Sequence, residues 1–501
     1  MAILRVAFAL ALLVQVIYAV SAQEPSKAEV LASMKRAASY YANEVASHGG
    51  YVYFYSLDLK QRWGEGVATR DQIWVQPPGT PTVGLALLEA YEATEDKLFL
   101  DAGVAAARAL IHGQLKSGGW TNCVDFNAKG TRVADYRNGK GRGKNNSSLD
   151  DGQTQSAIRL LIHADRLTKF QDREIHDAAL LAIKSLLAAQ FPNGGFPQVW
   201  TGPVQSQPII DANYPGYDWR TEGRIKNYWD MYTLNDNVCG YVADTLIEAH
   251  WIYRSPMLLE SIKKLGDFLV LAQMPKPQRG WAQQYNYDMQ PIWARKFEPP
   301  GVSGDETQEV IETLIKIALV TRESKYMEPI PAALEWLRQS QLPGGQVARY
   351  YELKTNRPLF MKRNGKQYSL TYSDADLPKH YGWKTASRVD ELTQLYNDVR
   401  FEDGGLDLRE AERFLRPFII TDIRRLPTGD ATRADEVSAV LSGLDEHGRW
   451  VSTYNGERLV GQAKMPVGAK YLSSEIFSSN LRVLARTQTF QDEASSTRSG
   501  D

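Results

Sequence analysis

A repeated turn is the feature that most constrains the fold of this 501-residue chain. Five times, a segment with helical character runs into a turn that contains glycine. These turns are His48–Tyr51, Gln114–Trp120, Gln190–Phe196, Gln273–Trp281 and Gln341–Gln346. The positions after the glycine, 51, 120, 196, 281 and 346, are 69, 76, 85 and 65 residues apart. Chain length alone suggests two or three domains, but a repeat of this length indicates one repeated architecture.

A second kind of helix lies between successive turns. Apolar residues at i, i+3, i+4 and i+7 begin at Gly84, Ala157 and Ile311, which is the period of a helix with one buried face. A fourth helix is expected after Asn235 and Asp236, and a fifth, weaker one over Ser387–Asp398. The helix-start signals are Thr80 with Pro81, Asp150 with Asp151, Asn235 with Asp236, and Ser303 with Asp305 and Glu306.

Helical hairpins of this kind bury a continuous core only by stacking on one another. We therefore predict an all-α fold, an α/α toroid, formed by residues 23–421 as the catalytic domain. An open solenoid is the alternative, but the long aromatic loops disfavour it. In a toroid the inner helices are parallel, so their N-termini and the acidic residues there meet at one mouth.

The tail, residues 422–501, is expected to pack on the toroid. Short strands are predicted at Trp450–Tyr454 and Arg458–Val460, around a turn at Asn455-Gly456. The end, from Ser495, is expected to be disordered.

Residues 1–22 have the pattern of a signal peptide. Arg5 precedes the apolar run Val6–Val20, and Val20-Ser21-Ala22 resembles a cleavage site. The run is shorter than the roughly 20 residues that span a bilayer. We therefore expect a secreted or periplasmic, soluble protein. Cys123 and Cys239 are expected to be buried thiols more than a disulfide.

The charge balance excludes bulk attraction to polyanions. The chain has 58 Lys+Arg and 59 Asp+Glu, a formal net charge of -1. Neither nucleic acid nor a membrane is therefore an expected partner, and any anionic ligand must be held by a local site. A monomer is expected, although the sequence leaves the oligomeric state open.

Two acidic clusters stand at predicted helix starts. Asp150 and Asp151 follow the basic, polar run Arg137–Ser148, and Asp236 stands in the next such segment. Both patterns also suit ordinary N-caps. Closely spaced oxygen ligands equally suit calcium, which takes about six to eight oxygens. We predict that Asp150, Asp151 and Asp236 bind a metal ion.

Aromatic residues and cations are mixed in residues 281–300, WAQQYNYDMQPIWARKFEPP. Arginine forks onto carboxylates, so such a mixture favours a site for a carbohydrate that carries acid groups. A loop packed in the core is the alternative, but it leaves the cations without a role. The predicted substrate-binding residues are Asp150, Trp281, Tyr285, Arg295, Lys296 and Glu298.

A further cluster of basic and aromatic residues runs from 362 to 383. His380 can act as a base at its ordinary pKa, whereas Lys379 needs a lowered one. A plain surface loop is the alternative. Lys379 and His380 are therefore the predicted catalytic residues of this cluster.

Four ordered motifs together resemble the pectic acid lyases, polysaccharide lyase family 10. They are LDDGQT from 149, QFPNGGFPQ from 190, LNDNV from 234 and the 281–300 stretch, and the resemblance covers roughly residues 30 to 400. It implies an α/α toroid, calcium (Ca²⁺) dependence and cleavage of an acidic plant polysaccharide, polygalacturonate, by anti β-elimination to 4,5-unsaturated products. It also implies that carboxylates matching Asp150 and Asp236 help to bind calcium and substrate, and that an arginine is the base.

One departure from the family leaves the base open. Where the family carries an arginine before a Gly-Tyr-x-Trp-like segment, this chain has Leu377–Trp383 without one, so the base is Lys379 or His380. The resemblance also implies that Arg363, in Arg-Asn-Gly, matches the other active-site arginine of the family, which makes it the third predicted catalytic residue. A non-catalytic protein that binds uronate polysaccharides and an unsaturated glucuronyl hydrolase are therefore alternatives. A triterpene cyclase, suggested by the turns at Gln114 and Gln190, is disfavoured because the chain lacks an Asp-x-Asp-Asp segment.

Overall fold

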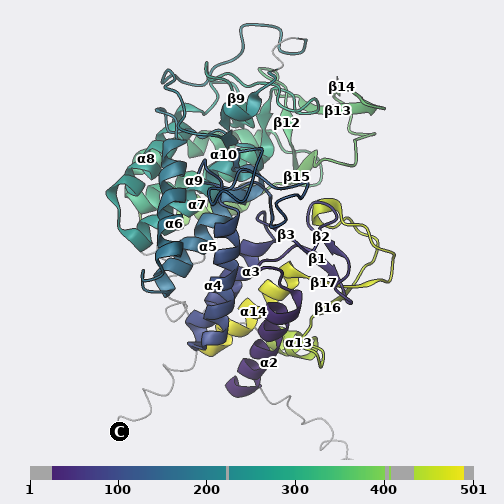
Figure 1. Ribbon diagram of the computed structural model, residues 1–501. Coiled ribbons are helices and arrows are strands. Elements are labelled where there is room, and N and C mark those ends of the chain that lie inside the picture. Colours follow the sequence, from purple (N-terminus) through teal and green to yellow (C-terminus); the bar gives the residue numbers. More distant parts are fainter. Residues whose placement is uncertain (1–24, 222–224, 401–404, 408–433, 490–501) are drawn as a thin grey trace, which may run out of the picture.

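The computed structural model describes residues 25–221, 225–400, 405–407 and 434–489. Most of them form helical hairpins stacked in a row (Figure 1). Each inner helix packs against the inner helix of the next hairpin, and each outer helix packs against its own partner. The inner helices are α3 (Thr80–Thr94), α5 (Gln153–Leu167), α7 (Val238–Tyr253), α9 (Gly304–Thr321) and α11 (Val389–Asp398). The outer helices are α4 (Lys97–His112), α6 (Arg173–Ala188), α8 (Pro256–Leu271) and α10 (Ile330–Gln339).

The inner helices confirm the predicted helical class. All five predicted helices are present, including the weaker candidate, which forms α11. α9 begins after Ser303, whose hydroxyl accepts the Glu306 N–H as an N-cap. The predicted stacking of hairpins is thus confirmed, while closure of the row into a ring stays a prediction.

Within the described ranges, no helix combines the length and the apolar character that crossing a membrane requires. The predicted signal peptide, residues 1–22, and the tail end from Ser495 lie outside the described residues.

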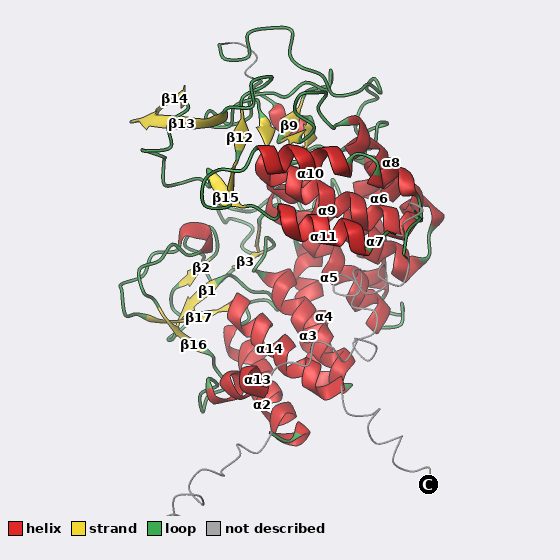
Figure 2. Cartoon of the chain, turned by 180° about the vertical axis from the view of Figure 1, so that it is seen from behind, coloured by secondary structure: helices red, strands yellow, loops and turns green. Residues whose placement is uncertain are grey.

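The C-terminal tail contributes to the helical row. α14 (Ser474–Thr489) packs against both α2 (Lys27–Tyr40) and α3, and α13 (Ala434–Ser442) packs on α14. Figure 2 shows these helices together at one end of the row. The tail therefore contributes helices to the fold as well as the expected short strand. The cause is an apolar face at helical spacing, Phe477, Leu481 and Leu484, which is fully buried.

Only one of the two predicted tail strands is found. β16 (Val451–Thr453) pairs with β17 (Lys470–Ser473) and not with Arg458–Val460, so the predicted turn at Asn455-Gly456 does not join two strands. β17 also pairs with β1 (Phe54–Ser56), and β1 pairs with β2 (Arg62–Trp63). β16 pairs with β17 because β17 is also held by β1 on its other edge. Hydrogen bonds on both edges place β17 inside a four-stranded sheet.

Short strands lie in the connections that lead to the inner helices, along one side of the row (Figure 2). In three two-stranded pairs, strands from successive repeats meet, which joins neighbouring loops where the inner helices begin. These pairs are β3 (Gln72–Trp74) with β4 (Cys123–Asp125), β5 (Ser147–Ser148) with β6 (Val199–Trp200), and β7 (Tyr232–Thr233) with β9 (Gln284–Tyr285). The remaining strands are β11 (Gln346–Ala348) with β15 (Lys384–Ala386), and a sheet of order β14-β13-β12-β10-β8 formed by Gln367–Thr371, Pro358–Asn364, Tyr350–Tyr351, Val302–Ser303 and Trp281–Ala282.

The repeated glutamine connects successive hairpins. In three repeats its amide donates one hydrogen bond to its own glycine turn and one to a carbonyl in or beside the outer helix of the next repeat. The glycine is needed because a Cβ at Gly194, where φ is 95°, would lie 1.7 Å from the Lys264 carbonyl oxygen. The accepting carbonyls are those of Gly118 and Ala178 for Gln114, Gly194 and Ser261 for Gln190, and Arg279 and Pro329 for Gln273, all at 2.9 to 3.0 Å.

Cys123 and Cys239 are free and buried, as predicted. Burial raises the pKa of both thiols above the ordinary value. Neither thiol is therefore a nucleophile at neutral pH.

Replacing Gln190 by leucine tests the connection between hairpins. The variant removes the partner of the Gly194 and Ser261 carbonyls and of the Ser261 hydroxyl, which donates to Gln190 Oε1 at 2.8 Å. We expect the free energy of unfolding, measured by urea denaturation, to fall by about 3 kcal/mol.

Gln341→Leu is the control, because this repeat-equivalent side chain is exposed and bonds to the Ser387 hydroxyl at the surface. Its effect should stay below about 0.5 kcal/mol. Equal losses in the two variants would contradict the connecting role.

Candidate functional site

Two turns of the same shape precede α5 and α7. They are the 3₁₀ turns η2 (Asp150–Gly152) and η4 (Asn235–Asn237). φ is 46° at Asp151 and 54° at Asp236, and the residue after each is also left-handed. Such backbone costs about 1 to 3 kcal/mol for a residue other than glycine and is concentrated at functional sites. Asp151 and Asp236 therefore occupy equivalent positions in successive repeats.

The turns bring three carboxylates together. Asp150, Asp151 and Asp236 each offer one oxygen, and these oxygens all lie within 4.8 Å of one another. None of the three caps a helix, since α5 and α7 begin after Gly152 and Asn237 without a side-chain cap bond. The predicted acidic residues are thus grouped at one place, and ordinary capping does not explain them.

The crowding of these carboxylates favours their protonated forms. Burial, together with the charge of Asp236, raises the pKa of Asp150 to about 6. Asp151 contacts solvent, yet the surrounding protein atoms and the adjacent Asp150 raise its pKa to about 7. Burial also raises the pKa of Asp236, against the nearby charges of Arg349 and Arg295. A bound divalent cation would relieve this repulsion.

Glutamine amides hold two of the carboxylates. Gln198 Nε2 donates to Asp150 Oδ1 at 2.6 Å, and Gln76 Nε2 donates to Asp151 Oδ2 at 2.8 Å. Each bond uses one oxygen of its carboxylate and leaves the second for a ligand. Outer hydrogen bonds of this kind orient the side chains that ligate metals.

The donor set fits calcium. Its three ligating groups are all carboxylates, and among the described residues this is the one group of three or more His, Cys, Asp or Glu side chains close enough to hold an ion. Hard cations such as Ca²⁺ prefer oxygen ligands. The three aspartates would hold the ion, with the other coordination positions left to water and substrate.

Arg295 lies beside the three carboxylates. The positive charge of Arg295 acts to lower the pKa of both Asp150 and Asp236, and its side chain is 42% exposed. The guanidinium donates to Glu298 Oε1 at 2.5 Å, and the Arg295 N–H donates to Glu298 Oε2 at 2.9 Å. Burial alone would lower the pKa of Arg295, but the pairing with Glu298 outweighs it and raises the pKa. The site therefore presents a fixed, reachable cation.

Arg349 is a residue of the site that the sequence did not single out. Its guanidinium lies 3.5 Å from Asp236 Oδ1, 3.3 Å from Asp305 Oδ2 and 3.4 Å from Glu306 Oε1. The group also lies 4.6 Å from the centre of the Tyr381 ring. The positive charge of Arg349 thus offsets the negative charges of the acids where α7 and α9 begin. The available signal was a cation among aromatics directly after a glycine turn, QVARYY.

Gln283 is a second such residue. Its Nε2 donates to Asn235 Oδ1 at 2.5 Å and to Glu298 Oε1 at 3.1 Å. The backbone carbonyl oxygen of Gln283 accepts hydrogen bonds from the N–H groups of Leu234 and Asn235, both at 3.0 Å. Gln283 thus holds the turn that carries Asp236 against the residue that positions the arginine.

Three predicted substrate contacts are corrected by burial. Trp281 and Tyr285 are 0% exposed, and they donate to the carbonyls of Leu269 and Ala272 at the end of α8, both at 2.7 Å. Both rings fix a loop and cannot stack on a sugar. Glu298 is 2% exposed, so it positions Arg295 instead of contacting a substrate.

The predicted cations outside the cluster lie on neighbouring loops. Arg363, in β13, is exposed and donates from Nε to the Gly365 carbonyl at 2.9 Å. Lys379 is exposed. Lys296 Nζ donates to the Lys366 carbonyl at 2.8 Å. Within the described contacts, none of these side chains touches the three aspartates.

His380 is packed among aromatic rings. Its Nε2 lies 3.1 Å from the Tyr368 hydroxyl, and its ring meets Phe297 edge-on with centroids 5.0 Å apart. Burial lowers the pKa of His380, and the charge of Arg363 lowers it further. The ring is therefore neutral at pH 7, but the structure does not place it against the carboxylates.

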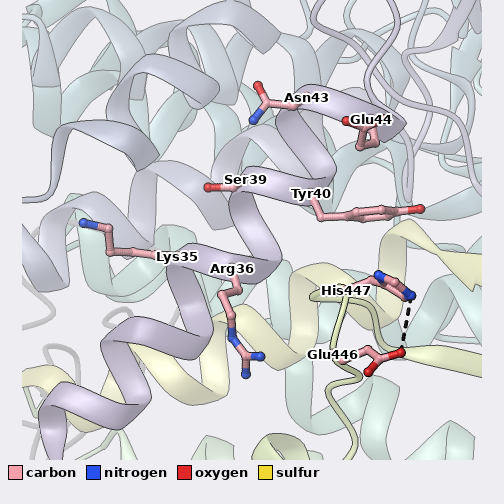
Figure 3. Close-up of a pocket in the computed structure, with 8 residues that line it drawn as sticks. All are labelled: Lys35, Arg36, Ser39, Tyr40, Asn43, Glu44, Glu446 and His447. Atoms are coloured by element: carbon pink, nitrogen blue, oxygen red, sulfur yellow. Dashed lines mark ion pairs between the residues drawn. The ribbon is translucent and has the colours of Figure 1, made fainter.

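A separate cavity of about 440 Å³ lies at the α2 end of the row (Figure 3). Residues of α2 and of the π-helical turn η1 (Tyr41–Val45) line it, together with Glu446 and His447. Glu446 and His447 pair with each other at 3.6 Å. None of the predicted site residues lines this cavity.

Comparison with known proteins gives one family. Residues 114–348 match the family described as pectic acid lyase. No curated protein matches the chain.

Several solved structures are similar at low sequence identity. One is a mutant family 10 polysaccharide lyase from Cellvibrio cellulosa in complex with trigalacturonic acid, with 20% identity, a TM-score of 0.44, and coverage of 64% of this chain and 98% of that chain. A D-mannose isomerase has 12% identity and a TM-score of 0.44 over 93% and 98% of the two chains. A cellobiose 2-epimerase from Bacillus thermoamylovorans has 12% identity and a TM-score of 0.44 over 92% and 98%.

Asp236→Asn tests the metal site. Removing one of three carboxylate ligands should weaken calcium binding at least about tenfold in isothermal titration calorimetry. Without calcium, the pKa values of Asp150 and Asp151 should fall, because the Asp236 charge that raises both is gone; NMR of carbon-labelled aspartate measures this shift. Asp288→Asn, at an exposed position, should change neither quantity. Unchanged calcium affinity in Asp236→Asn would place the ion elsewhere.

Proposed function

We propose that this chain, whose residues 114–348 belong to the pectic acid lyase family, is a pectate lyase that cleaves polygalacturonate by anti β-elimination. The family match confirms the predicted resemblance and the predicted enzyme class, a polysaccharide lyase. The observation that carries the proposal is the group of three crowded carboxylates with a partly exposed arginine, Arg295, inside the matched segment.

The substrate is a chain of sugars that each carry a carboxylate. The C5 proton lies α to that carboxylate and is weakly acidic until the growing negative charge is balanced. When bound, a calcium ion would supply positive charge to the sugar carboxylate. Arg349 and Gln283 keep the Asp236 turn in place for this arrangement, and Glu298 keeps Arg295 pointed at it.

Arg295 is the base in this proposal. The resemblance implies an arginine in that role, and Arg295 is the arginine that is both beside the aspartates and open to solvent. In its neutral form Arg295 takes the C5 proton, the electron pair of the C5–H bond forms the C4–C5 double bond, and the C4–O bond breaks; the guanidinium later returns the proton to solvent. The leaving oxygen is protonated by solvent. Water does not attack the sugar, so the pair of spaced carboxylates of a glycosidase is not needed.

We further propose that the protein is secreted or periplasmic. The support is the signal-peptide pattern of residues 1–22 together with the polymeric nature of the substrate.

Polygalacturonate with calcium or with a chelator tests the function. We expect ultraviolet absorbance from a 4,5-unsaturated product in calcium, and its loss in chelator. Asp236→Asn should abolish the product, whereas Asp288→Asn should not. Calcium-dependent binding without any product would overturn the lyase and support a binding protein. Removal of absorbance from unsaturated oligomers would support the hydrolase.

The pH profile identifies the base. Because its pKa is raised, Arg295 is almost wholly protonated at neutral pH, and its neutral fraction grows about tenfold for each pH unit. The rate on polygalacturonate should therefore keep rising from pH 7 to about 10. Arg295→Lys should retain part of the activity with a profile moved to lower pH, since lysine has the lower pKa.

Arg363→Lys is the matched control and should leave the profile unchanged, because Arg363 lies away from the aspartates. A rate that levels off near the lowered pKa of His380, below about 6.5, would instead assign the base to histidine.

A further inference from the structure

One segment carries a concentration of positive charge that the reaction does not use. Residues 129–144, called here the basic loop, contain six cations and one acid, although the whole chain has a net charge of -1. The acid, Asp135, already pairs with Lys116 outside the loop at 2.9 Å. The cations are Lys129, Arg132, Arg137, Lys140, Arg142 and Lys144.

Four of these cations face solvent. Arg137, Lys140, Arg142 and Lys144 are exposed, and none makes an ion pair within the described part of the chain. A Cβ added at Gly139 or Gly143 would meet no atom within 4 Å, so the backbone is open at these two positions, whereas Gly141 packs against Ala134 of the same loop. These charges are therefore available to an anionic partner.

The first end of the basic loop is linked to the acid cluster through residues 65, 66 and 76. The Arg132 guanidinium lies 5.0 Å from the centre of the Trp74 ring and beside Gly66. The residue before this glycine, Glu65, accepts a hydrogen bond at 3.4 Å from Gln76, the amide that also holds Asp151.

The second end meets the cluster as well. After the loop the chain passes through β5 to Ser148, whose hydroxyl accepts the Asp150 N–H at 3.2 Å. The six Cα–Cα steps from Lys144 to Asp150 span at most about 20 Å of extended chain. Lys144, the last exposed cation of the loop, thus lies within a few sugar units of Asp150.

The composition of the loop selects among anionic partners. Its aromatic residue, Tyr136, is 1% exposed, so the loop offers no ring on which nucleic-acid bases stack. The segment between its exposed cations, 138–143, consists of glycine, asparagine and further cations, without an apolar side chain to enter a bilayer. Regularly spaced carboxylates on a flexible polymer fit cations of this kind.

We propose that the basic loop binds the polygalacturonate chain next to the sugars held at the aspartates. This inference rests on the proposed function and extends it, because the loop favours a polymer over a short oligomer. The bound chain then runs from the basic loop across the three aspartates to Arg295.

The experiment compares long and short substrates. In the variant with Arg137→Gln, Lys140→Gln, Arg142→Gln and Lys144→Gln, kcat/KM for polygalacturonate should fall about tenfold or more and lose much of its salt dependence. The value for trigalacturonate should stay within about twofold, because a trimer fills the positions at the aspartates and leaves the loop unoccupied.

A matched control removes four exposed cations on the outer helices, by Lys97→Gln, Arg173→Gln, Lys184→Gln and Lys264→Gln. This control variant should leave kcat/KM for both substrates unchanged, and it matches the change in net charge of the loop variant. Circular dichroism melting checks that both variants fold. An equal loss on both substrates, or no loss on the polymer, would overturn the proposal.

Binding separates this proposal from the reaction itself. Affinity electrophoresis in polygalacturonate should show weaker retardation of the loop variant than of the wild type and the control, whether or not the wild type yields product. Absence of product with loop-dependent retardation would overturn the lyase and keep the loop. Loop-dependent binding of duplex DNA or phosphatidylserine vesicles in place of polygalacturonate would overturn the loop proposal.

Discussion

The side-by-side packing of the inner helices is the constraint on which the rest of the structure depends. Glutamine side chains and glycine turns fix each hairpin to the next, so α5 and α7 start at neighbouring points. The residues just before these helices must then share one space. Left-handed backbone at Asp151 and Asp236 turns the chain sharply there and brings three carboxylates within 4.8 Å. Such crowding of negative charge is unfavourable, and a bound cation would relieve it.

Local charge replaces a global field in this protein. A chain with a net charge of -1 cannot attract a polyanion over its whole surface. The positive charges of Arg295 and Arg349 instead offset the charge of the aspartates locally, and each arginine is held by buried or partly buried acids. The basic loop adds exposed positive charge, and β5 connects its end to the turn that carries Asp150. Arg295 and Arg349 are paired with acids, whereas the four exposed cations of the basic loop make no ion pair among the described residues.

Much of the helical framework could be predicted from the sequence. Apolar residues at a period of 3.6 locate the inner helices, and the Gln–Gly spacing marks the turns. The tail helix α14 was not predicted because no glycine turn of the repeated kind precedes it. Phe477, Leu481 and Leu484 nevertheless show the same helical spacing. Periodicity gives the buried face of a helix, but not the neighbour that covers it.

The sequence by itself determined the helices, the turn residues and the three aspartates, because these depend on local spacing and residue type. Only the tertiary structure decided which residues of the aromatic stretch reach a ligand. Trp281 and Arg295 stand in the same 20-residue segment, yet one ring is fully buried and the other side chain is 42% exposed. Arg349 and Gln283 join the site from strands and loops far along the chain. Their roles follow from distances across the fold, which local pattern does not contain.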